Sequence, residues 1–211
     1  EAIVIGREPG TIIEKAVWAD SVVIGCGLGR DAKTAGFILE LLSSEKIAEK
    51  KLILDADALH ALSGKELSSE LEKCRQVILT PHQGELSGLS GLGADEIAAN
   101  PIETARNFAR KHSINLLLKG NPTVIAASEG PVLLNTSGTE ALATAGSGDV
   151  LSGMIAALAA KGADICDAAA AAAWFHGRAG DLADDVSSLV SSGMVIDFIH
   201  AAIHEVFESH D

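Results

Sequence analysis

Short apolar runs that end at glycine, aspartate or proline recur through the first two thirds of the chain. They are AIVIG (2–6), SVVIG (21–25), KLILDAD (51–57), QVILTPH (76–82) and NLLLKG (115–120). Runs of this kind, rich in Val, Ile and Leu, are typical of parallel strands buried on both faces. Helix-length segments with a 3.6-residue period, 31–50 and 101–112 among them, lie between the runs. The alternation predicts right-handed βαβ units and a doubly wound α/β sheet.

The chain changes character after the last of these runs. TVIAAS (123–128) and VLLN (132–135), separated by an EGP turn, predict a hairpin of shorter strands. Alanine-rich helical patterns then cover 148–161, about 167–184 and about 194–208. A chain of 211 residues with 47% hydrophobic residues can fill one α/β core, so we expect a single domain over residues 1–211.

The charge balance excludes several classes of partner. The formal net charge is -13, and no block of basic residues is longer than Lys50-Lys51. We therefore expect no nucleic acid and no membrane partner, and any phosphate-bearing ligand must be held by backbone amides and a few cations. Three widely spaced cysteines, no apolar run long enough to span a bilayer and no signal pattern favour a soluble, cytoplasmic protein.

Ligands of an open parallel sheet bind beyond the carboxyl ends of its strands. The first such loop is GCGLG (25–29), whose glycines let backbone approach a ligand while the helix opening near Asp31 offers free N–H groups. Tight-turn geometry explains the same glycines, and the loop matches neither GxGxxG nor a phosphate loop. Both interpretations remain open for this turn.

The next two loops carry ionisable side chains. Asp55 and Asp57 lie on the same side at strand spacing, where they would meet Mg²⁺ or a ligand hydroxyl, or where one of them caps the helix beginning near Ala58. His82 and Glu85 follow the third run and face the same crevice. A structural role for His82 is as consistent with this pattern as a ligand contact.

The fourth strand-end loop begins at Lys119. This cation and the following residues, 120–123, are suited to a phosphate or ribose near exposed backbone, although a lysine at a strand end is also often simply solvated.

ATAGSGDVLSG (143–153) is the most informative segment. Small residues before Asp149 leave room for N–H groups to converge on negative charge, and the helix beginning near 148 adds its positive dipole end. Asp149 in the first turn then has two possible roles: helix cap, or base that takes a proton from an attacking hydroxyl.

Five motifs in order resemble those of the NAD(P)H-hydrate dehydratase family of the ribokinase-like superfamily. They are GCGLGR (25–30), LDADAL (54–59), LTPHQGE (79–85), LKGNPTVIA (118–126) and ATAGSGDVLSG (143–153), and HGRAGDLA (176–183) continues the similarity. The resemblance implies a three-layer αβα fold with a mostly parallel central sheet. It also implies that members usually carry a further N-terminal segment, so we expect residues 1–211 to be N-terminally incomplete relative to the family.

The resemblance implies repair of damaged nicotinamide cofactor. ADP or ATP, with Mg²⁺, phosphorylates the hydroxyl of hydrated NADH or NADPH (NADHX, NADPHX), and phosphate then leaves. Carried over by motif, Asp149 is the base and a substrate contact. The other implied substrate contacts are Gly27, Gly29 and His82. The implied nucleotide contacts are Lys119, Gly120, Asn121, Pro122, Thr123 and Gly148, and the implied anion hole is Gly146, Ser147 and Gly148. No residue is singled out as a ligand of the metal.

Some residues depart from the family pattern. Thr139-Glu140 stands where members commonly have an Asn-Pro pair, which puts a carboxylate close to the presumed phosphates. Two other functions fit the same motifs: an ATP-dependent kinase for a small alcohol such as a vitamin precursor, and a truncated chain that binds nucleotide without turnover. The alanine-rich helices are also compatible with a homo-oligomer.

Overall fold

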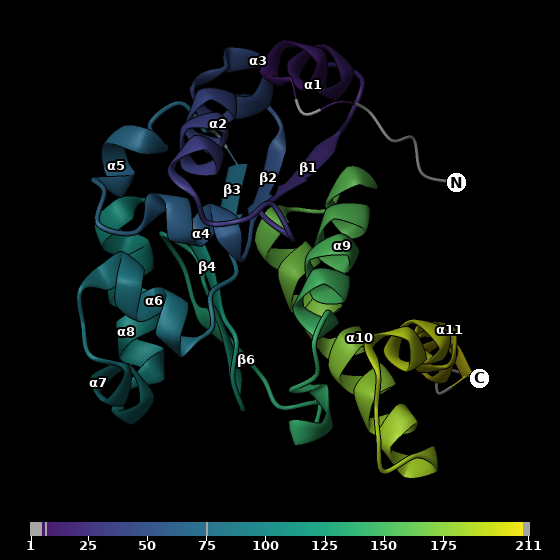
Figure 1. Cartoon of the computed structure of the whole chain (residues 1–211). Coiled ribbons are helices and arrows are strands. Elements are labelled where there is room, and N and C mark those ends of the chain that lie inside the picture. Colours follow the sequence, from purple (N-terminus) through teal and green to yellow (C-terminus); the bar gives the residue numbers. More distant parts are fainter. Residues whose placement is uncertain (1–5, 7, 75, 209–211) are drawn as a thin grey trace.

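A computed structural model describes residues 6, 8–74 and 76–208 of the chain. Six strands form one sheet in the order β1-β2-β3-β4-β5-β6, of which β1 to β4 are parallel and β5 and β6 antiparallel (Figure 1). Their bounds are Ser21–Ile24 (β1), Lys51–Leu54 (β2), Gln76–Leu79 (β3), Asn115–Leu118 (β4), Thr123–Ala126 (β5) and Val132–Asn135 (β6). The predicted hairpin is confirmed as β5 and β6. The strand predicted over 2–6 falls, apart from Gly6, outside the described residues.

Two layers of helices cover the sheet, so the predicted three-layer αβα architecture is confirmed (Figure 1). The first layer comprises α1 (Pro9–Ala16), α2 (Ala32–Ser43), α3 (Glu45–Ala48), α4 (Asp57–Leu62), α5 (Leu67–Glu70), α6 (Gln83–Ser90), α7 (Ala94–Ala99) and α8 (Pro101–His112). On the other side lie α9 (Ser147–Ala160) and α10 (Ile165–Val186), and α11 (Ser192–Glu208) packs on α10. A short 3₁₀ helix, η1 (Glu140–Leu142), precedes α9.

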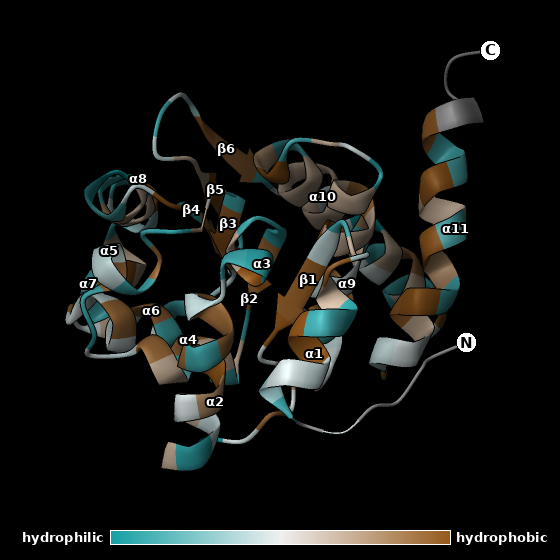
Figure 2. Cartoon of the chain, turned by 90° about the horizontal axis from the view of Figure 1, so that it is seen from above, coloured by the Kyte–Doolittle hydropathy of each residue, from teal (hydrophilic) through white to brown (hydrophobic). Residues whose placement is uncertain are grey.

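Successive side chains of a strand point to opposite faces of the sheet, so a continuous apolar run makes both faces of the sheet apolar. Leu52 and Leu54 of β2 belong to the core beneath α2 to α8, whereas Ile53 belongs to the core beneath α9 and α10. All three side chains are fully buried, and Figure 2 shows the strands as hydrophobic ribbons between the helical layers. Alanines of α10 line the second core and let that helix approach the sheet closely.

The prediction of a doubly wound sheet is wrong for the described strands. The parallel strands follow one another in chain order, without the reversal that double winding requires. Right-handed connections that always advance in one direction place their helices on one face. The second face is covered instead by α9 and α10, which follow the last strand.

The helix boundaries agree closely with the periodicity. The prediction for 101–112 matches α8, and those for 148–161, 167–184 and 194–208 match α9, α10 and α11 within two residues. The segment 31–50 is divided at Ser44, whose extended backbone (φ -74°, ψ 124°) ends α2 and begins α3. None of the described helices combines the length and apolar character that crossing a bilayer requires.

Truncating one core side chain tests the second face of the sheet. Ile53 is 0% exposed between β2 and the α9–α10 layer, so we expect Ile53→Ala to lower the free energy of unfolding by about 2–5 kcal/mol. Leu189→Ala is the control, because Leu189 is 83% exposed and its truncation should change stability by less than about 0.5 kcal/mol. Urea denaturation measures both variants; equal losses would contradict this description of the core.

Candidate active site

The loops that follow β1 to β4 meet the N-terminus of α9 at one edge of the sheet. Lys119, directly after β4, contacts Asp55, directly after β2, with 2.9 Å between Nζ and Oδ1. The backbone N–H of Lys119 also donates to the carbonyl of Pro81, after β3 (2.8 Å). Ser152 of α9 donates its hydroxyl to Oδ2 of Asp55 at 2.7 Å. Residues far apart in sequence thus form one connected polar cluster.

The glycine-rich turn after β1 depends on its missing side chains. Gly25, Gly27 and Gly29 all have positive φ, a conformation that favours glycine. At Gly25 a Cβ would also lie 1.7 Å from the carbonyl oxygen of Asp55, so the turn presses directly on the loop after β2. Both the tight-turn interpretation and a close backbone approach to a ligand are compatible with this geometry.

Asp55 and Asp57 bind different partners, although strand spacing predicted a shared ligand. The chain leaves the strand conformation at Ala56, between the two aspartates (φ 48°, ψ -113°). Asp57 accepts hydrogen bonds from Nε of Arg30 (2.9 Å) and the N–H of Gly29 (2.7 Å). These contacts, Arg30 first, lower the pKa of Asp57 below its ordinary value. Asp57 thus stabilises the glycine-rich turn through hydrogen bonds, and its side chain does not cap α4.

His82 begins α6 through a reciprocal capping box. Its Nδ1 accepts from the N–H of Glu85 (3.2 Å), and Glu85 Oε2 accepts from the N–H of His82 (2.9 Å). The structural role considered for His82 is therefore present. Its side chain is still 58% exposed and borders the pocket described next, so a ligand contact remains a prediction.

A pocket of about 670 Å³ opens between the loop after β4 and the helices of the second layer. Its walls come from 119–123, 135–143, the start of α9 and the middle of α10. Of the predicted nucleotide contacts, Lys119, Gly120, Asn121, Thr123 and Gly148 line it, while Pro122 does not. Glu140, which departs from the family pattern, is exposed and borders the same pocket.

Glycines of α10 let one wall of this pocket approach the helix. A Cβ on Gly177 would lie 2.1 Å from Oγ of Ser137, and one on Gly180 would lie 2.6 Å from Leu142. The segment 137–142 therefore rests directly on α10. Gly177 and Gly180 of HGRAGDLA (176–183) therefore have a steric function, which the sequence pattern alone did not assign.

The start of α9 has the features of an anion-binding helix N-terminus. Gly146 caps the helix in the left-handed conformation (φ 85°), and the first N–H groups of a helix have no intrahelical acceptors. Ser147 and Gly148 of the predicted anion hole line the pocket, whereas Gly146 lies just outside its lining. Oγ of Ser147 is 3.1 Å from Nε2 of His176 on α10.

Asp149 lies in the first turn of α9 and is exposed, while the N-cap position is held by Gly146. Its carboxylate, the Cys26 sulfur and an Asp55 oxygen lie within 4.8 Å of one another. Burial, followed by hydrogen bonding to Asp149, raises the pKa of the Cys26 thiol to about 12. Cys26 is thus a protonated neighbour of Asp149 at neutral pH.

This trio does not form a dedicated cage for Mg²⁺. It is the one group of three potential ligands found within the described part of the chain. A protonated thiol is a poor ligand for Mg²⁺, which prefers oxygen, and both Asp55 oxygens already accept hydrogen bonds from protein donors. Asp149 is the member with a carboxylate open to solvent.

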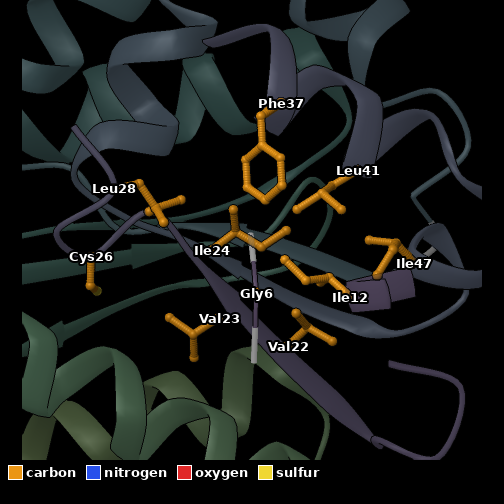
Figure 3. A pocket seen from close by; sticks show the side chains of 11 residues that line it. Gly6, Ile12, Val22, Val23, Ile24, Cys26, Leu28, Phe37, Leu41 and Ile47 are labelled. Atoms are coloured by element: carbon orange, nitrogen blue, oxygen red, sulfur yellow. The ribbon is translucent and has the colours of Figure 1, made fainter. Parts of the chain in front are cut away.

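A second, apolar pocket of about 410 Å³ flanks β1. Figure 3 shows Leu28, Phe37 and Leu41 on one side of this strand, while Cys26 and Val23 point to the other. Its apolar lining is unsuited to phosphate.

Two members of the cluster were not identified from sequence. His176 has no role assigned from the sequence, yet it is 6% exposed and contacts Ser147. Ser152, three residues after Asp149, had no assigned role, yet it binds Asp55. Helical spacing places Ser152 on the same side of α9 as Asp149, which was the available signal.

The fold and the strand-end site together define a ribokinase-like protein. A ribokinase-like superfamily protein of Enterococcus faecalis matches with a TM-score of 0.82 and 26% identity, covering 97% of this chain and 70% of that one. Within this class, the chain belongs to the NAD(P)H-hydrate dehydratase family, whose sequence model matches residues 3–200.

Two relatives carry more specific names. An ADP-dependent (S)-NAD(P)H-hydrate dehydratase of Neisseria meningitidis is 36% identical over 174 residues, which is 82% of this chain. This chain spans 58% of that relative's length. An ADP/ATP-dependent NAD(P)H-hydrate dehydratase of Bacillus subtilis, co-crystallized with ATP and Mg²⁺ and soaked with CoA, has a TM-score of 0.74 and 29% identity, covering 92% of this chain and 71% of that one.

Burial of His176 predicts a loss of stability in acid. Burial lowers the pKa of His176 from 6.5 to about 4, so the unfolded chain binds its proton at higher pH than the folded chain. The associated stability is complete above pH 6.5 and falls as the pH drops toward 4, by about 3 kcal/mol at most. We expect His176→Gln to flatten this part of the stability profile in urea titrations; parallel profiles for both proteins would contradict the assignment.

Proposed function

We propose that this chain is a nucleotide-dependent dehydratase that repairs hydrated NADH or NADPH. The observation that carries the proposal is the placement of Asp149. Its exposed carboxylate lies in the first turn of α9, with the pocket beside Lys119 and Gly148 on one side and the turn containing Cys26 on the other. Membership of the NAD(P)H-hydrate dehydratase family supports the reaction.

The pocket of about 670 Å³ has the size expected of a small-molecule site. We assign the adenine nucleotide, ADP or ATP, to it. The ammonium of Lys119 and the N–H of Gly148 would hold the transferring phosphate, which gives this acidic protein a local site for an anion. The N–H of Ser147, part of the predicted anion hole, donates instead to the carbonyl of Thr144 (3.2 Å). Thr123, whose hydroxyl donates to the carbonyl of Gly120 (2.9 Å), shapes the rest of that wall.

Asp149 would act as the general base. It takes the proton of the hydrate hydroxyl, whose oxygen then attacks the terminal phosphorus of the nucleotide, and the shortened nucleotide leaves. Phosphate then departs with the electron pair of its C–O bond, a proton leaves the neighbouring ring carbon, and the double bond of the dihydropyridine is restored. The helix N-terminus stabilises charge that develops on the phosphoryl oxygens. Gly27 and Gly29, in the turn that contains Cys26, and His82, at the border of the nucleotide pocket, are the proposed contacts of the hydrated cofactor.

Mg²⁺ would enter with the nucleotide phosphates, since this ion commonly keeps several waters and relies on substrate phosphate for ligands. This assignment agrees with the absence of a three-ligand oxygen cage among the described residues. Because NADH and NADPH serve metabolism inside the cell, the proposed reaction belongs in the cytoplasm.

Incubation with NADHX or NADPHX tests the reaction directly. We expect absorbance of the reduced nicotinamide to appear when ADP or ATP is added with Mg²⁺, together with stoichiometric release of phosphate. Nucleotide without hydrate is the blank. Failure to restore absorbance with both nucleotides would sink the proposal, and phosphorylation of a small alcohol in its place would identify a kinase.

Asp149→Asn tests the role of the base. Removing the proton acceptor should lower kcat by roughly 10²- to 10⁴-fold, while nucleotide binding measured by calorimetry changes little. Asp167→Asn is a matched control, because Asp167 is also an exposed aspartate in the first turn of a helix, α10, but lies outside the site. Turnover that survives Asp149→Asn at more than a few per cent of normal would reject this assignment.

A further inference from the structure

A buried carboxylate of the strand-end cluster has no role in the mechanism above. Asp55 is 1% exposed, at the end of β2. Oδ1 accepts from Nζ of Lys119 and from the N–H of Ala56, both at 2.9 Å, and Oδ2 accepts from Oγ of Ser152 at 2.7 Å. The side chain thus joins three elements: β2, the residue after β4, and α9.

A carboxylate in this position is a costly way to hold a core together. Burying a charge carries a desolvation penalty of several kcal/mol, which an ion partner offsets only with good geometry, and apolar replacements of such pairs are often neutral or stabilising. Stability alone is therefore a weak explanation for a carboxylate at position 55. Positioning of its partners is a better explanation, because charge-assisted hydrogen bonds fix the separation and direction of the groups that they join.

Both partners of Asp55 belong to the proposed phosphoryl-transfer site. Lys119 lines the nucleotide pocket, and Ser152 lies one turn beyond Asp149 on α9. A Cβ on Gly148 would lie 3.4 Å from Nζ of Lys119 and 3.8 Å from Oδ2 of Asp55. The helix N-terminus, the cation and the buried carboxylate are therefore in close contact.

Lys119 has a competing acceptor. Oε2 of Glu85 lies 3.8 Å from Nζ, compared with 2.9 Å for Asp55. The Lys119 side chain is 24% exposed and is long enough to turn toward Glu85 or solvent. Asp55 keeps its ammonium beside α9, where a phosphate at the helix N-terminus would meet it.

We propose that Asp55 is a positioning residue: its two oxygens hold Lys119 and the first turns of α9 in fixed register, so that cation, helix N-terminus and base act on one phosphoryl group. The inference rests on the proposed function. It assigns to LDADAL a role that neither Mg²⁺ binding nor helix capping describes. Asp55 acts through Lys119 and Ser152, without contact to substrate.

A double-mutant cycle between Asp55 and Lys119 tests the proposal. Asp55→Asn keeps the size of the side chain and can still bond Ser152, but it loses the charge that holds the ammonium. Because small misplacements of reacting groups are costly, we expect kcat to fall roughly 10- to 100-fold, with a smaller change in the nucleotide KM. Asp55→Asn combined with Lys119→Met should be no slower than Lys119→Met alone, since one residue acts through the other.

Lys51→Met is the matched control. Lys51 also ties the sheet to α9, through hydrogen bonds from Nζ to the carbonyls of Ala159 (3.0 Å) and Ala163 (2.8 Å), but at the opposite end of β2. Its loss should lower the free energy of unfolding and leave kcat unchanged. The proposal is overturned if Asp55→Asn behaves in the same way, with kcat within about threefold of normal, or if the two losses in the cycle multiply as independent effects do.

Ser152→Ala provides a second variant should Asp55→Asn not fold, because it removes one hydrogen bond and leaves the ion pair. It should lower kcat several-fold and speed amide hydrogen exchange over residues 147–152, relative to the same amides in Lys51→Met. Unchanged kcat and unchanged exchange would overturn the proposal.

The proposed function and this inference fail differently. If the wild-type chain restores no NADH or NADPH from NADHX or NADPHX, the proposed function is wrong. The double-mutant cycle is then repeated with two other measurements: the nucleotide Kd, and amide hydrogen exchange over residues 147–152. Coupling between Asp55 and Lys119 in either measurement supports the positioning role of Asp55. Additive effects in both measurements overturn it.

Discussion

The parallel register of β1 to β4 is the constraint on which the site depends. Parallel pairing aligns Ile24, Leu54 and Leu79, so that the residue after each strand emerges at the same edge of the sheet. Burial of both faces holds this register, because a slip of one residue would exchange Ile53 and Leu54 between two different cores. The position of the polar loops is thus a consequence of apolar packing.

An acidic chain binds phosphate only where its few cations and dipoles are concentrated. At the strand ends, Lys119 is surrounded by the carboxylates of Asp55 and Glu85, and Glu140 borders the same pocket. The additional positive potential comes from the backbone at the start of α9. In the proposed site, Lys119 would therefore contribute through its orientation more than through its charge, and its partner Asp55 would set that orientation.

Close approach between layers gives the site its shape, and glycine makes the approach possible. Gly25 lets the turn after β1 press on the carbonyl of Asp55, and Gly177 and Gly180 let the segment 137–142 rest on α10. These contacts set the distance between the turn near Cys26 and the pocket beside Lys119. Asp149 lies between them because α9 enters from the opposite layer to the helices that connect the strands.

Apolar periodicity and turn residues were sufficient to predict the described strands, the hairpin and the boundaries of α8 to α11, because these features follow from interactions between near neighbours in the chain. Ordered motifs further identified the loops that meet at the sheet edge. Periodicity did not indicate the direction in which successive strands add to the sheet. That direction depends on packing between distant elements. It left the second face of the described sheet to be covered by α9 and α10.

The chemistry divides in the same way. The sequence by itself determined which side chains follow each strand, including Asp55, Lys119 and Asp149. Only the tertiary structure decided that Ala56 turns Asp57 away toward Arg30, that buried His176 meets Ser147, and that Asp55 pairs with Lys119 and Ser152. The physical reason is that a buried polar group must find a partner wherever the fold brings one, and these partners are separated by 27 to 97 residues.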